Sequence, residues 1–200
     1  MIKVYIINSL DIKEEDKNIL FPFEIEKINN IKNKEDKLLS LSSLLLVKAF
    51  TYKEDIKYTL FNKPYKINKP FFSISHSNPY SIICISSNNV GIDIENINRI
   101  NSNLKNNLFS NNEKKLIQSD EDYIKLWTIK EACYKVKNSS LFNFKDEIIL
   151  DNNRCHYLNN SYFYKSFKFE NYYISIASFT DFDYEYNLIS KEELYLKLNK

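Results

Sequence analysis

The sequence predicts an α+β protein of two similar halves, each an antiparallel sheet packed with helices. A long amphipathic stretch at residues 34–50 precedes closely spaced β-type segments between residues 71 and 94. Helical stretches between residues 111 and 137 precede two further β-type segments between residues 162 and 179. Short turns separate neighbouring β-type segments, and turns of this length join antiparallel strands.

The first half opens with a strand predicted over Val4–Ile7 and continues with a helix predicted over Lys34–Phe50. Apolar side chains recur along this helix at the spacing that forms one face. They are Leu38, Leu41, Leu45 and Leu46. Asn33 is a suitable N-cap, because its side-chain oxygen can accept a hydrogen bond from an N–H of the first turn.

Three strands are predicted next, over Phe71–Ser75, Tyr80–Ser86 and Val90–Ile94. Turns rich in Ser, Asn and Pro separate them, so we expect an antiparallel meander. The chain then becomes polar over residues 96–103, which is the best candidate for a boundary. We therefore expect an N-terminal half at residues 1–98 and a C-terminal half at residues 99–200.

The second half begins with a short helix predicted over Asn111–Ser119 and a longer one over Glu121–Lys137. Strands follow over Tyr162–Phe169 and Tyr172–Phe179, joined by a tight turn at residues 170–171. Each half thus combines helices with an antiparallel sheet, although no convincing sequence repeat relates the two.

Composition limits the classes of function. The 200 residues carry 28 basic and 26 acidic side chains, a mixed surface that argues against nucleic acid as the main partner. Three widely spaced cysteines form no Cys-x-x-Cys pair, as expected of reduced thiols. The N-terminus does not resemble a signal peptide, and no apolar run is long enough to span a membrane. We expect a cytoplasmic protein without a membrane partner.

Three carboxylates are candidates for a metal site. Asp93 and Glu95 lie two apart on a predicted strand and so project from the same face, and Glu131 lies one turn before Lys135 on the predicted long helix. Carboxylate oxygens are suited to Mg²⁺, which usually shares itself with substrate phosphates, and Lys130 and Lys135 could hold those phosphates. Taken alone, the same residues are also compatible with a solvated strand face and a helix-surface ion pair.

The single glycine, Gly91, falls two residues before Asp93. A missing side chain at this point would let another backbone or a ligand come close.

The order and context of these residues resemble the Sfp-type 4′-phosphopantetheinyl transferase family across most of the chain. Residues 72–77, Phe-Ser-Ile-Ser-His-Ser, are similar to the family segment Phe-Asn-x-Ser-His-Ser. Residues 90–95, Val-Gly-Ile-Asp-Ile-Glu, are similar to its Ile-Gly-Ile-Asp-Ile-Glu, and residues 127–135 match its Trp-x-x-Lys-Glu-x-x-x-Lys. Weaker similarities lie at Asn62-Lys63-Pro64 and at residues 108–113, Leu-Phe-Ser-Asn-Asn-Glu.

The resemblance implies the phosphopantetheinyl transferase fold, two pseudo-symmetric α+β halves with coenzyme A between them. It implies that Mg²⁺ and the coenzyme A pyrophosphate are bound together by Asp93, Glu95 and Glu131. It also implies phosphate-binding or adenosine-binding roles for Lys63, Ser75, His76, Lys130 and Lys135. The single-chain length favours this type, acting as a monomer, over the short trimeric carrier-protein synthases.

The reaction implied by the resemblance is attack by a serine hydroxyl of an apo acyl or peptidyl carrier protein on the β-phosphate of coenzyme A. Adenosine 3′,5′-bisphosphate leaves. Serine is a weak nucleophile near neutral pH and needs a general base, for which Glu131 and Glu113 are the candidates. Lys135 would face the charge that develops on the phosphoryl group.

The sequence departs from the family pattern on the first long helix. The family carries a basic residue there, where this chain has Leu39 and Ser40. Lys37 or Lys48 could substitute for it. Two smaller departures are Asn62 in place of a glycine and Ser73 in place of an asparagine.

Two other functions stay open: a non-catalytic relative that binds carrier proteins, and a magnesium-dependent nuclease. The nuclease is less compatible, because such enzymes place Glu-x-Lys on a strand and carry a basic excess. A carrier protein would dock between residues 104 and 125, where basic and apolar side chains gather. The candidates are Lys105, Phe109, Lys114 and Lys115.

Overall fold

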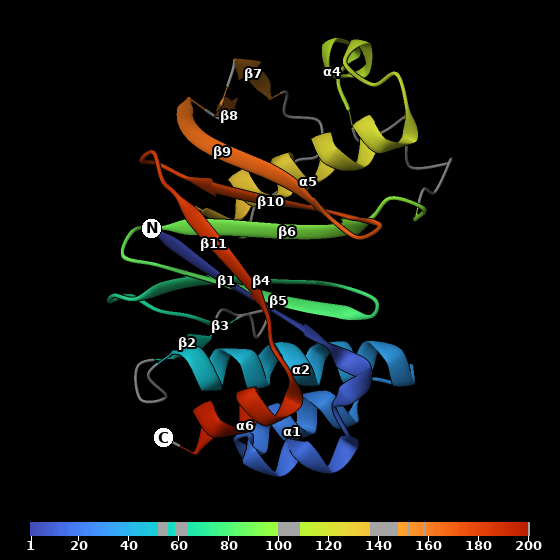
Figure 1. Ribbon diagram of the computed structural model, residues 1–200, viewed down its shortest axis with the longest axis vertical. Coiled ribbons are helices and arrows are strands. Elements are labelled where there is room, and N and C mark those ends of the chain that lie inside the picture. The colour runs from blue at the N-terminus through green and yellow to red at the C-terminus, as the bar shows by residue number, and fades with distance from the viewer. Residues whose placement is uncertain are drawn as a thin grey trace. The chain divides into compact units, whose positions relative to one another are not determined.

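The computed structural model describes residues 1–51, 56–58, 64–99, 109–136, 148–151, 153–157 and 159–199. Over these ranges the chain forms helices and mainly antiparallel strands, which confirms the predicted α+β class (Figure 1). The chain divides into two compact units. Unit 1 comprises Met1–Ser87 with Tyr184–Lys200, and unit 2 comprises Asn88–Asp183.

These units differ from the predicted halves at residues 1–98 and 99–200. Strand β6 (Val90–Asn96) pairs with β10 (Tyr172–Ser178) of unit 2 and does not continue the meander after the preceding hairpin. Strand β11 (Tyr184–Leu188) returns to unit 1 and pairs with β1 (Ile2–Asn8). Long-range pairing therefore decides which unit each segment joins, whereas the polar stretch after Glu95 is a local signal.

The sheet of unit 1 has the strand order β11-β1-β5-β4. Strands β4 (Phe71–Ser77) and β5 (Tyr80–Ser86) form an antiparallel hairpin, and β5 also pairs antiparallel with β1. The pair of β1 and β11 is parallel, so this sheet is mixed where an antiparallel one is predicted. Two short strands, β2 (Lys57–Tyr58) and β3 (Pro64–Tyr65), pair separately.

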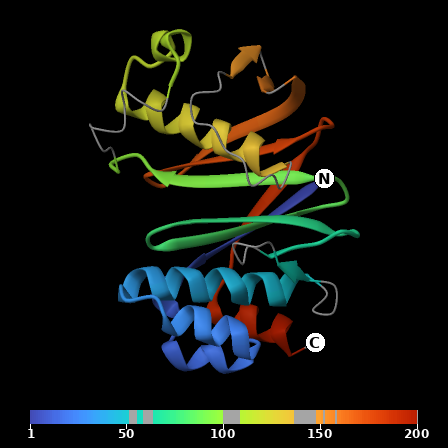
Figure 2. The same ribbon diagram turned by 180° about the vertical axis from the view of Figure 1, so that it is seen from behind.

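Helix α2 (Lys34–Phe50) occupies the range that the sequence predicts. Asn33 caps it, because its Oδ1 accepts hydrogen bonds from the backbone N–H groups of Glu35 at 2.8 Å and Asp36 at 3.1 Å. Within unit 1, α2 lies against the sheet, and α1 (Pro22–Asn29) and α6 (Lys191–Leu198) lie on its other side (Figure 2). Two 3₁₀ helices, η1 (Ser9–Asp11) and η2 (Glu14–Ile19), precede α1.

The core of unit 1 surrounds α2, which is covered from both sides. Leucines on opposite faces of the helix are buried, and Leu39, on its first turns, is 4% exposed. A helix buried on most of its circumference needs apolar residues all round. This position between two layers explains why residues 44–47 form a continuous apolar run.

The sheet of unit 2 has the strand order β6-β10-β9-β8-β7. Its remaining strands are β7 (Ile149–Asp151), β8 (Arg154–Tyr157) and β9 (Asn160–Phe169). Strands β9 and β10 form the hairpin that the sequence predicts, and Glu170 in its turn has a positive φ of 51°. Neighbouring strands in this sheet run antiparallel.

Helix α5 (Asp120–Val136) lies across β6, β10 and β9. It comes so close to β6 that a Cβ placed on Gly91 would clash with the carbonyl oxygen of Ala132 and lie 2.8 Å from the backbone nitrogen of Val136. The missing side chain at Gly91 thus allows the backbone of α5 to pack directly against β6. Helix α4 (Asn111–Lys115) ends before the predicted Ser119, whose hydroxyl instead accepts a hydrogen bond from Asp122 N near the start of α5.

Over the described ranges, no helix combines the length and apolar character needed to cross a membrane. The three cysteines are buried free thiols.

Candidate functional site

Most of the predicted site residues lie in unit 2, on three elements. Asp93 and Glu95 lie on β6, Glu113 on α4, and Glu131 with its neighbouring lysines on α5. Ser75 and His76 lie on β4 in unit 1, and Lys63 falls outside the described residues.

The three predicted metal ligands all interact electrostatically with Lys135. Its Nζ lies 2.7 Å from Oδ1 of Asp93, and the two side chains are 14% and 5% exposed. Burial by itself would lower the pKa of Lys135, but the negative charges of Asp93, Glu131 and Glu95 outweigh it and raise that pKa above its ordinary value. The fold therefore brings the charges of all three carboxylates to bear on one ammonium group.

The donor chemistry of these residues fits Mg²⁺, because three carboxylates are hard oxygen ligands. The geometry is that of an ion pair with Lys135. Among the residues that the structure describes, no group of three or more His, Cys, Asp or Glu side chains is close enough to hold one metal ion. The metal site therefore stays a prediction, and the observed cation partner of Asp93 is Lys135.

Lys130 and Glu113 form a fully buried ion pair between α5 and α4. Lys130 Nζ lies 2.9 Å and 3.2 Å from the two carboxylate oxygens of Glu113, and both side chains are 0% exposed. Glu113 also accepts hydrogen bonds from the backbone N–H groups of Ser110 at 2.6 Å and Ile148 at 3.0 Å.

This environment differs from the roles predicted for the pair. A lysine that neutralises substrate phosphate and a glutamate that takes a proton from a partner's serine both need access to those ligands. In this structure the side chains of Lys130 and Glu113 contact each other, and neither is exposed to solvent. The roles predicted for Lys130 and Glu113 stay predictions, and Glu131, which is half-buried, is the more accessible of the two candidate bases.

A row of hydroxyl groups joins α5 to strands β10 and β9 beside Asp93. Ser175 on β10 is the register partner of Asp93, and its Oγ lies 2.7 Å from Thr128 Oγ1 on α5 and 2.7 Å from Ser166 Oγ on β9. Sequence reasoning did not select these residues. The available signal was Ser175, a polar residue in the middle of an otherwise apolar strand.

A second cross-strand contact lies beside Glu95. Tyr173 is the register partner of Glu95, and its hydroxyl donates a hydrogen bond to Glu121 Oε1 at 2.6 Å. Lys168 Nζ lies 2.5 Å from the same oxygen. Burial and the bond to Glu121 raise the pKa of Tyr173 to about 12. These contacts hold the first turn of α5 over β9 and β10.

The Glu121 contact predicts a pH-dependent stability. Its bonds to Lys168 and Tyr173 hold the pKa of Glu121 below the ordinary value of 4.5. A carboxylate with a lowered folded-state pKa stabilises the protein above its unfolded-state pKa, and this contribution is lost as the pH falls through the folded-state pKa.

We expect Glu121→Gln to be less stable than the wild type at neutral pH, with the difference disappearing below the lowered pKa. The effect will be small, because the Glu121 side chain is 40% exposed. Urea unfolding of both proteins at several pH values measures it. A difference that stays constant with pH would show that the charge of Glu121 does not contribute.

In unit 1, His76 is exposed and Ser75 is 9% exposed, near the β4–β5 turn. The position that lacks the family's basic residue lies in the core. Leu39 is buried there, and its carbonyl oxygen accepts hydrogen bonds from the hydroxyls of Ser42, Ser43 and Ser81.

The two lysines suggested as substitutes have other partners. Lys48 is 3% exposed and lies 3.0 Å from Glu24, so burial keeps it from a ligand. Lys37 lies 3.4 Å from Glu14. Lys48 is therefore the less accessible of the two, and the suggestion that Lys37 replaces the missing basic residue stays a prediction.

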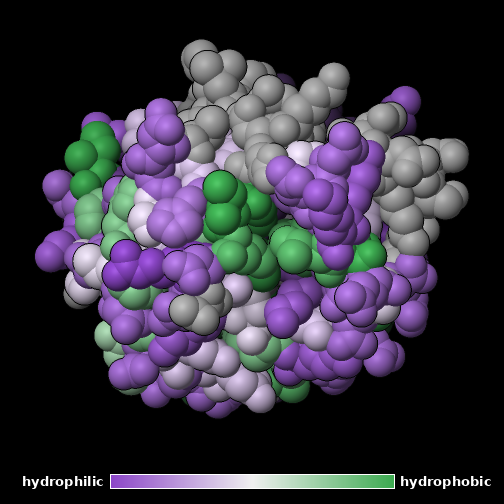
Figure 3. Space-filling view, turned by 90° about the horizontal axis from the view of Figure 1, so that it is seen from above, coloured by the Kyte–Doolittle hydropathy of each residue, from purple (hydrophilic) through white to green (hydrophobic). Residues whose placement is uncertain are grey.

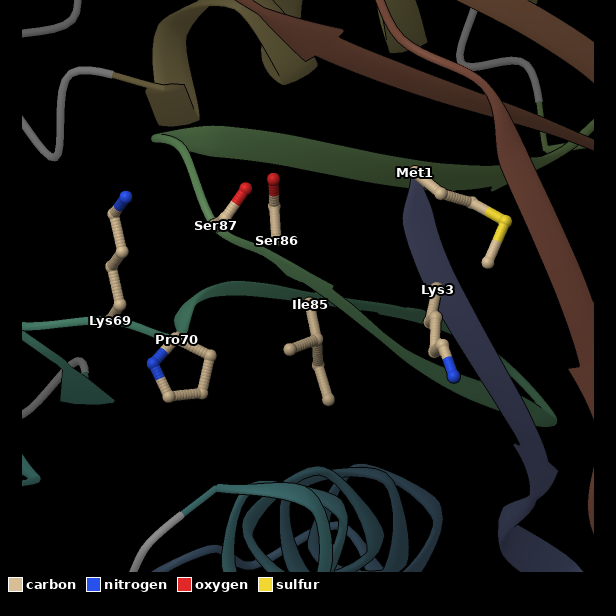
Figure 4. A pocket seen from close by; sticks show the side chains of 7 residues that line it. All are labelled: Met1, Lys3, Lys69, Pro70, Ile85, Ser86 and Ser87. Atoms are coloured by element: carbon tan, nitrogen blue, oxygen red, sulfur yellow. The ribbon is translucent and has the colours of Figure 1, made fainter.

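A pocket of about 420 Å³ lies in unit 1 at the other end of the β4–β5 hairpin (Figure 4). Phe71 pairs with Ser86 at this end, whereas Ser77 pairs with Tyr80 at the turn near His76. No residue predicted for the site lines the pocket. The lining consists of Met1, Lys3, Lys69, Pro70, Ile85, Ser86 and Ser87.

Comparison with known proteins shows which family model unit 2 matches. Residues 89–182 match the model of the 4′-phosphopantetheinyl transferase superfamily. The matched range includes the carboxylates on β6 and α5, the buried pair and Lys135. It agrees with the resemblance that the motifs indicate.

One curated relative is the 4′-phosphopantetheinyl transferase gsp of Aneurinibacillus migulanus, with which the chain is 31% identical over 100 residues. The aligned region covers 47% of this chain and 42% of that protein. The match thus spans less than half of the relative's length.

Proposed function

We propose that this protein transfers the 4′-phosphopantetheine arm of coenzyme A to a serine of an apo acyl or peptidyl carrier protein. The proposal rests on the electrostatic interaction of Asp93, Glu95 and Glu131 with the ammonium group of Lys135. All four residues lie within the range that matches the superfamily. Carboxylates are the oxygen ligands that Mg²⁺ prefers, so the chemistry of these side chains is compatible with the proposal.

The bond changes of the proposed reaction are those of a phosphoryl transfer. A bond forms between the serine oxygen of the carrier protein and the β-phosphorus of coenzyme A, and the pyrophosphate P–O bond breaks. Adenosine 3′,5′-bisphosphate leaves with the electron pair of that bond. The proton of the serine hydroxyl passes to a base, and the accessibility of Glu131 favours it over the buried Glu113.

Asp93, Glu95 and Glu131 would hold Mg²⁺ in this proposal. When bound, the ion supplies positive charge to the pyrophosphate oxygens. Lys135, on the same helix face as Glu131, would turn its ammonium toward the phosphate that gains negative charge. The hydroxyl row from Thr128 through Ser175 and the hydrogen bond from Tyr173 to Glu121 would keep α5 in place over β6.

Ser75 and His76 would contact the 3′-phosphate of coenzyme A, together with Lys63. The exposure of His76 supports this assignment. Because Leu39 is buried and Lys48 is paired with Glu24, α2 adds no charge from these positions. We propose that the 3′-phosphate is held with fewer cations than the family pattern implies.

The carrier protein would dock on α4 and the residues that follow it. Lys114, Lys115 and Leu116 are exposed there, with Leu116 at 54%. Viewed over this end of unit 2, hydrophobic side chains gather between hydrophilic ones (Figure 3). Phe109, also a candidate, is 5% exposed and packs on Tyr123 and Trp127. It therefore lies beneath this surface and is not exposed on it. Lys105 lies outside the described residues.

The two alternative functions make different demands. The superfamily match favours a transferase over a magnesium-dependent nuclease. A non-catalytic carrier-protein binder would bind the carrier protein without transferring the phosphopantetheine arm, so a transfer assay distinguishes the two.

The deciding experiment is intact mass spectrometry of an apo carrier protein incubated with this protein, coenzyme A and Mg²⁺. We expect a mass gain of one phosphopantetheine unit, which EDTA and the Asp93→Ala variant both abolish. Asp183→Ala is the matched control, because Asp183 is 92% exposed and outside the site. No gain with several carrier proteins, from a folded sample, would favour the non-catalytic binder.

A further inference from the structure

Another pocket of unit 1, of about 390 Å³, lies at the end of α2, where β1 and residues 187–197 contribute to its lining. These residues include the end of β11 and most of α6, which follows β11 directly in the chain (Figure 1). Small-molecule sites have volumes of about 300–1,000 Å³, so this pocket can hold a small ligand. No residue in its lining takes part in the proposed transfer reaction.

Four of the side chains that line the pocket are aromatic or aliphatic. The rings of Tyr5 and Phe50 are stacked, with centroids 3.8 Å apart and an angle of 18° between their planes. Ile189 is 8% exposed and Leu196 is 66% exposed. Flat aromatic faces beside aliphatic side chains favour a ligand that carries an apolar ring.

The pocket also has one anionic and one cationic side chain, both on α6. Glu193 precedes Lys197 by four residues, the order that favours an ion pair on a helix. Within the described part of the chain, however, the two side chains do not form this ion pair. Glu193 Oε2 accepts a hydrogen bond from the backbone N–H of Ser190 at 2.8 Å, and Lys197 Nζ lies 6.0 Å from the centre of the Phe50 ring. The second oxygen of Glu193 and the ammonium group of Lys197 can therefore bind a ligand.

The charges of Glu193 and Lys197 cancel, so the pocket favours neither a simple anion nor a simple cation. A ligand that carries an ammonium and a carboxylate group would pair with both side chains at once. Asn187, the register partner of Tyr5, adds an amide that can donate and accept hydrogen bonds. The polar groups of the lining thus match a zwitterion, and the rings of Tyr5 and Phe50 match an aromatic group.

We propose that this pocket binds a free α-amino acid with an aromatic side chain. The carboxylate of the ligand pairs with Lys197, its ammonium group pairs with Glu193, and its ring packs against Tyr5 and Phe50. This inference does not depend on the proposed transfer reaction, because the two use different residues.

The first test is isothermal titration calorimetry of the whole chain with L-phenylalanine. Two analogues each lack one charged group: 2-phenylethylamine has no carboxylate, and 3-phenylpropionate has no ammonium group. We expect L-phenylalanine to bind about tenfold more tightly than either analogue, because each analogue leaves one charged hydrogen bond unmade. Binding of either analogue as tight as that of L-phenylalanine, or no binding of L-phenylalanine, would overturn the proposal.

Two variants remove the charges of the pocket one at a time. Lys197→Met changes an exposed side chain, and Glu193→Gln keeps an acceptor for the N–H of Ser190, so both should fold. We expect each variant to bind L-phenylalanine about tenfold more weakly than the wild type. The matched control is Lys32→Met, which removes an exposed lysine of unit 1 outside the pocket and should leave the affinity unchanged. Unchanged affinity in both α6 variants, or an equal loss in Lys32→Met, would overturn the proposal.

Methyl NMR of the wild type tests where the amino acid binds. Leu196 lies in the pocket and is 66% exposed, whereas Leu10 is 63% exposed and lies outside it. We expect L-phenylalanine to shift the methyl resonances of Leu196 and Ile189 and to leave those of Leu10 in place. Equal shifts at Leu196 and Leu10 would indicate non-specific contact and contradict the proposal. None of these measurements involves transfer activity, so their outcome is separate from that of the proposed function.

Discussion

Replacing Lys130 by methionine should lower the free energy of unfolding of unit 2 by about 3–5 kcal/mol, the cost of leaving one member of a buried ion pair without its partner. Glu113 would then lie at 0% exposure without its ammonium partner, and among the described residues the backbone N–H groups of Ser110 and Ile148 would remain as its donors. Urea unfolding followed by the fluorescence of Trp127 measures the loss, because this single tryptophan lies on α5.

The double variant Lys130→Met/Glu113→Leu is the control. Removing both charges takes away the penalty of an unpaired ion, so it should recover a large part of the stability lost in the single variant. If Lys130 instead binds substrate phosphate, Lys130→Met would remain nearly as stable as the wild type and lose only coenzyme A affinity. That result would restore the role predicted from the motif.

Gly91→Ala should destabilise unit 2 by about 3 kcal/mol, at the upper end of overpacking effects, because a methyl group meets backbone atoms that cannot rotate away. The added Cβ would clash with the carbonyl oxygen of Ala132 and lie 2.8 Å from Val136 N. Helix α5 must then move away from β6. Since these two elements carry Lys135 and Asp93, the 2.7 Å contact between them should lengthen as well.

Unfolding followed by Trp127 fluorescence also measures this effect. Asn89→Ala, an exposed position just before β6, is the matched control and should change the stability little. A Gly91→Ala protein as stable as the wild type would show that α5 does not pack on β6 as closely as the structure has it.

Elements with local signals were predictable from the sequence. The N-cap at Asn33 and the helical spacing of the leucines define α2, and its predicted range agrees with the structure. The hairpin of β9 and β10 was also predicted, because a tight turn separates two β-type segments. Strands β7, β8 and β11 were not, since short or exposed strands have little apolar pattern.

The candidate site was partly predictable for a similar reason. The two-residue spacing of Asp93 and Glu95 on a strand fixes their common face, and the four-residue spacing of Glu131 and Lys135 fixes theirs on a helix. Spacing within each segment says nothing about which residues of α5 face which residues of β6. The contact between Lys135 and Asp93, and the burial of Lys130 against Glu113, needed the packed structure.

The sequence by itself determined the α+β class, the motifs that resemble phosphopantetheinyl transferases and the identity of the charged residues. Only the tertiary structure decided how strands are shared between the units, with β6 joining β10 and β11 returning to β1. It also decided that Lys130 is buried against Glu113 and that Lys135 pairs with Asp93. The physical reason is that periodicity is a local property, whereas strand pairing and charge burial depend on segments far apart in the chain.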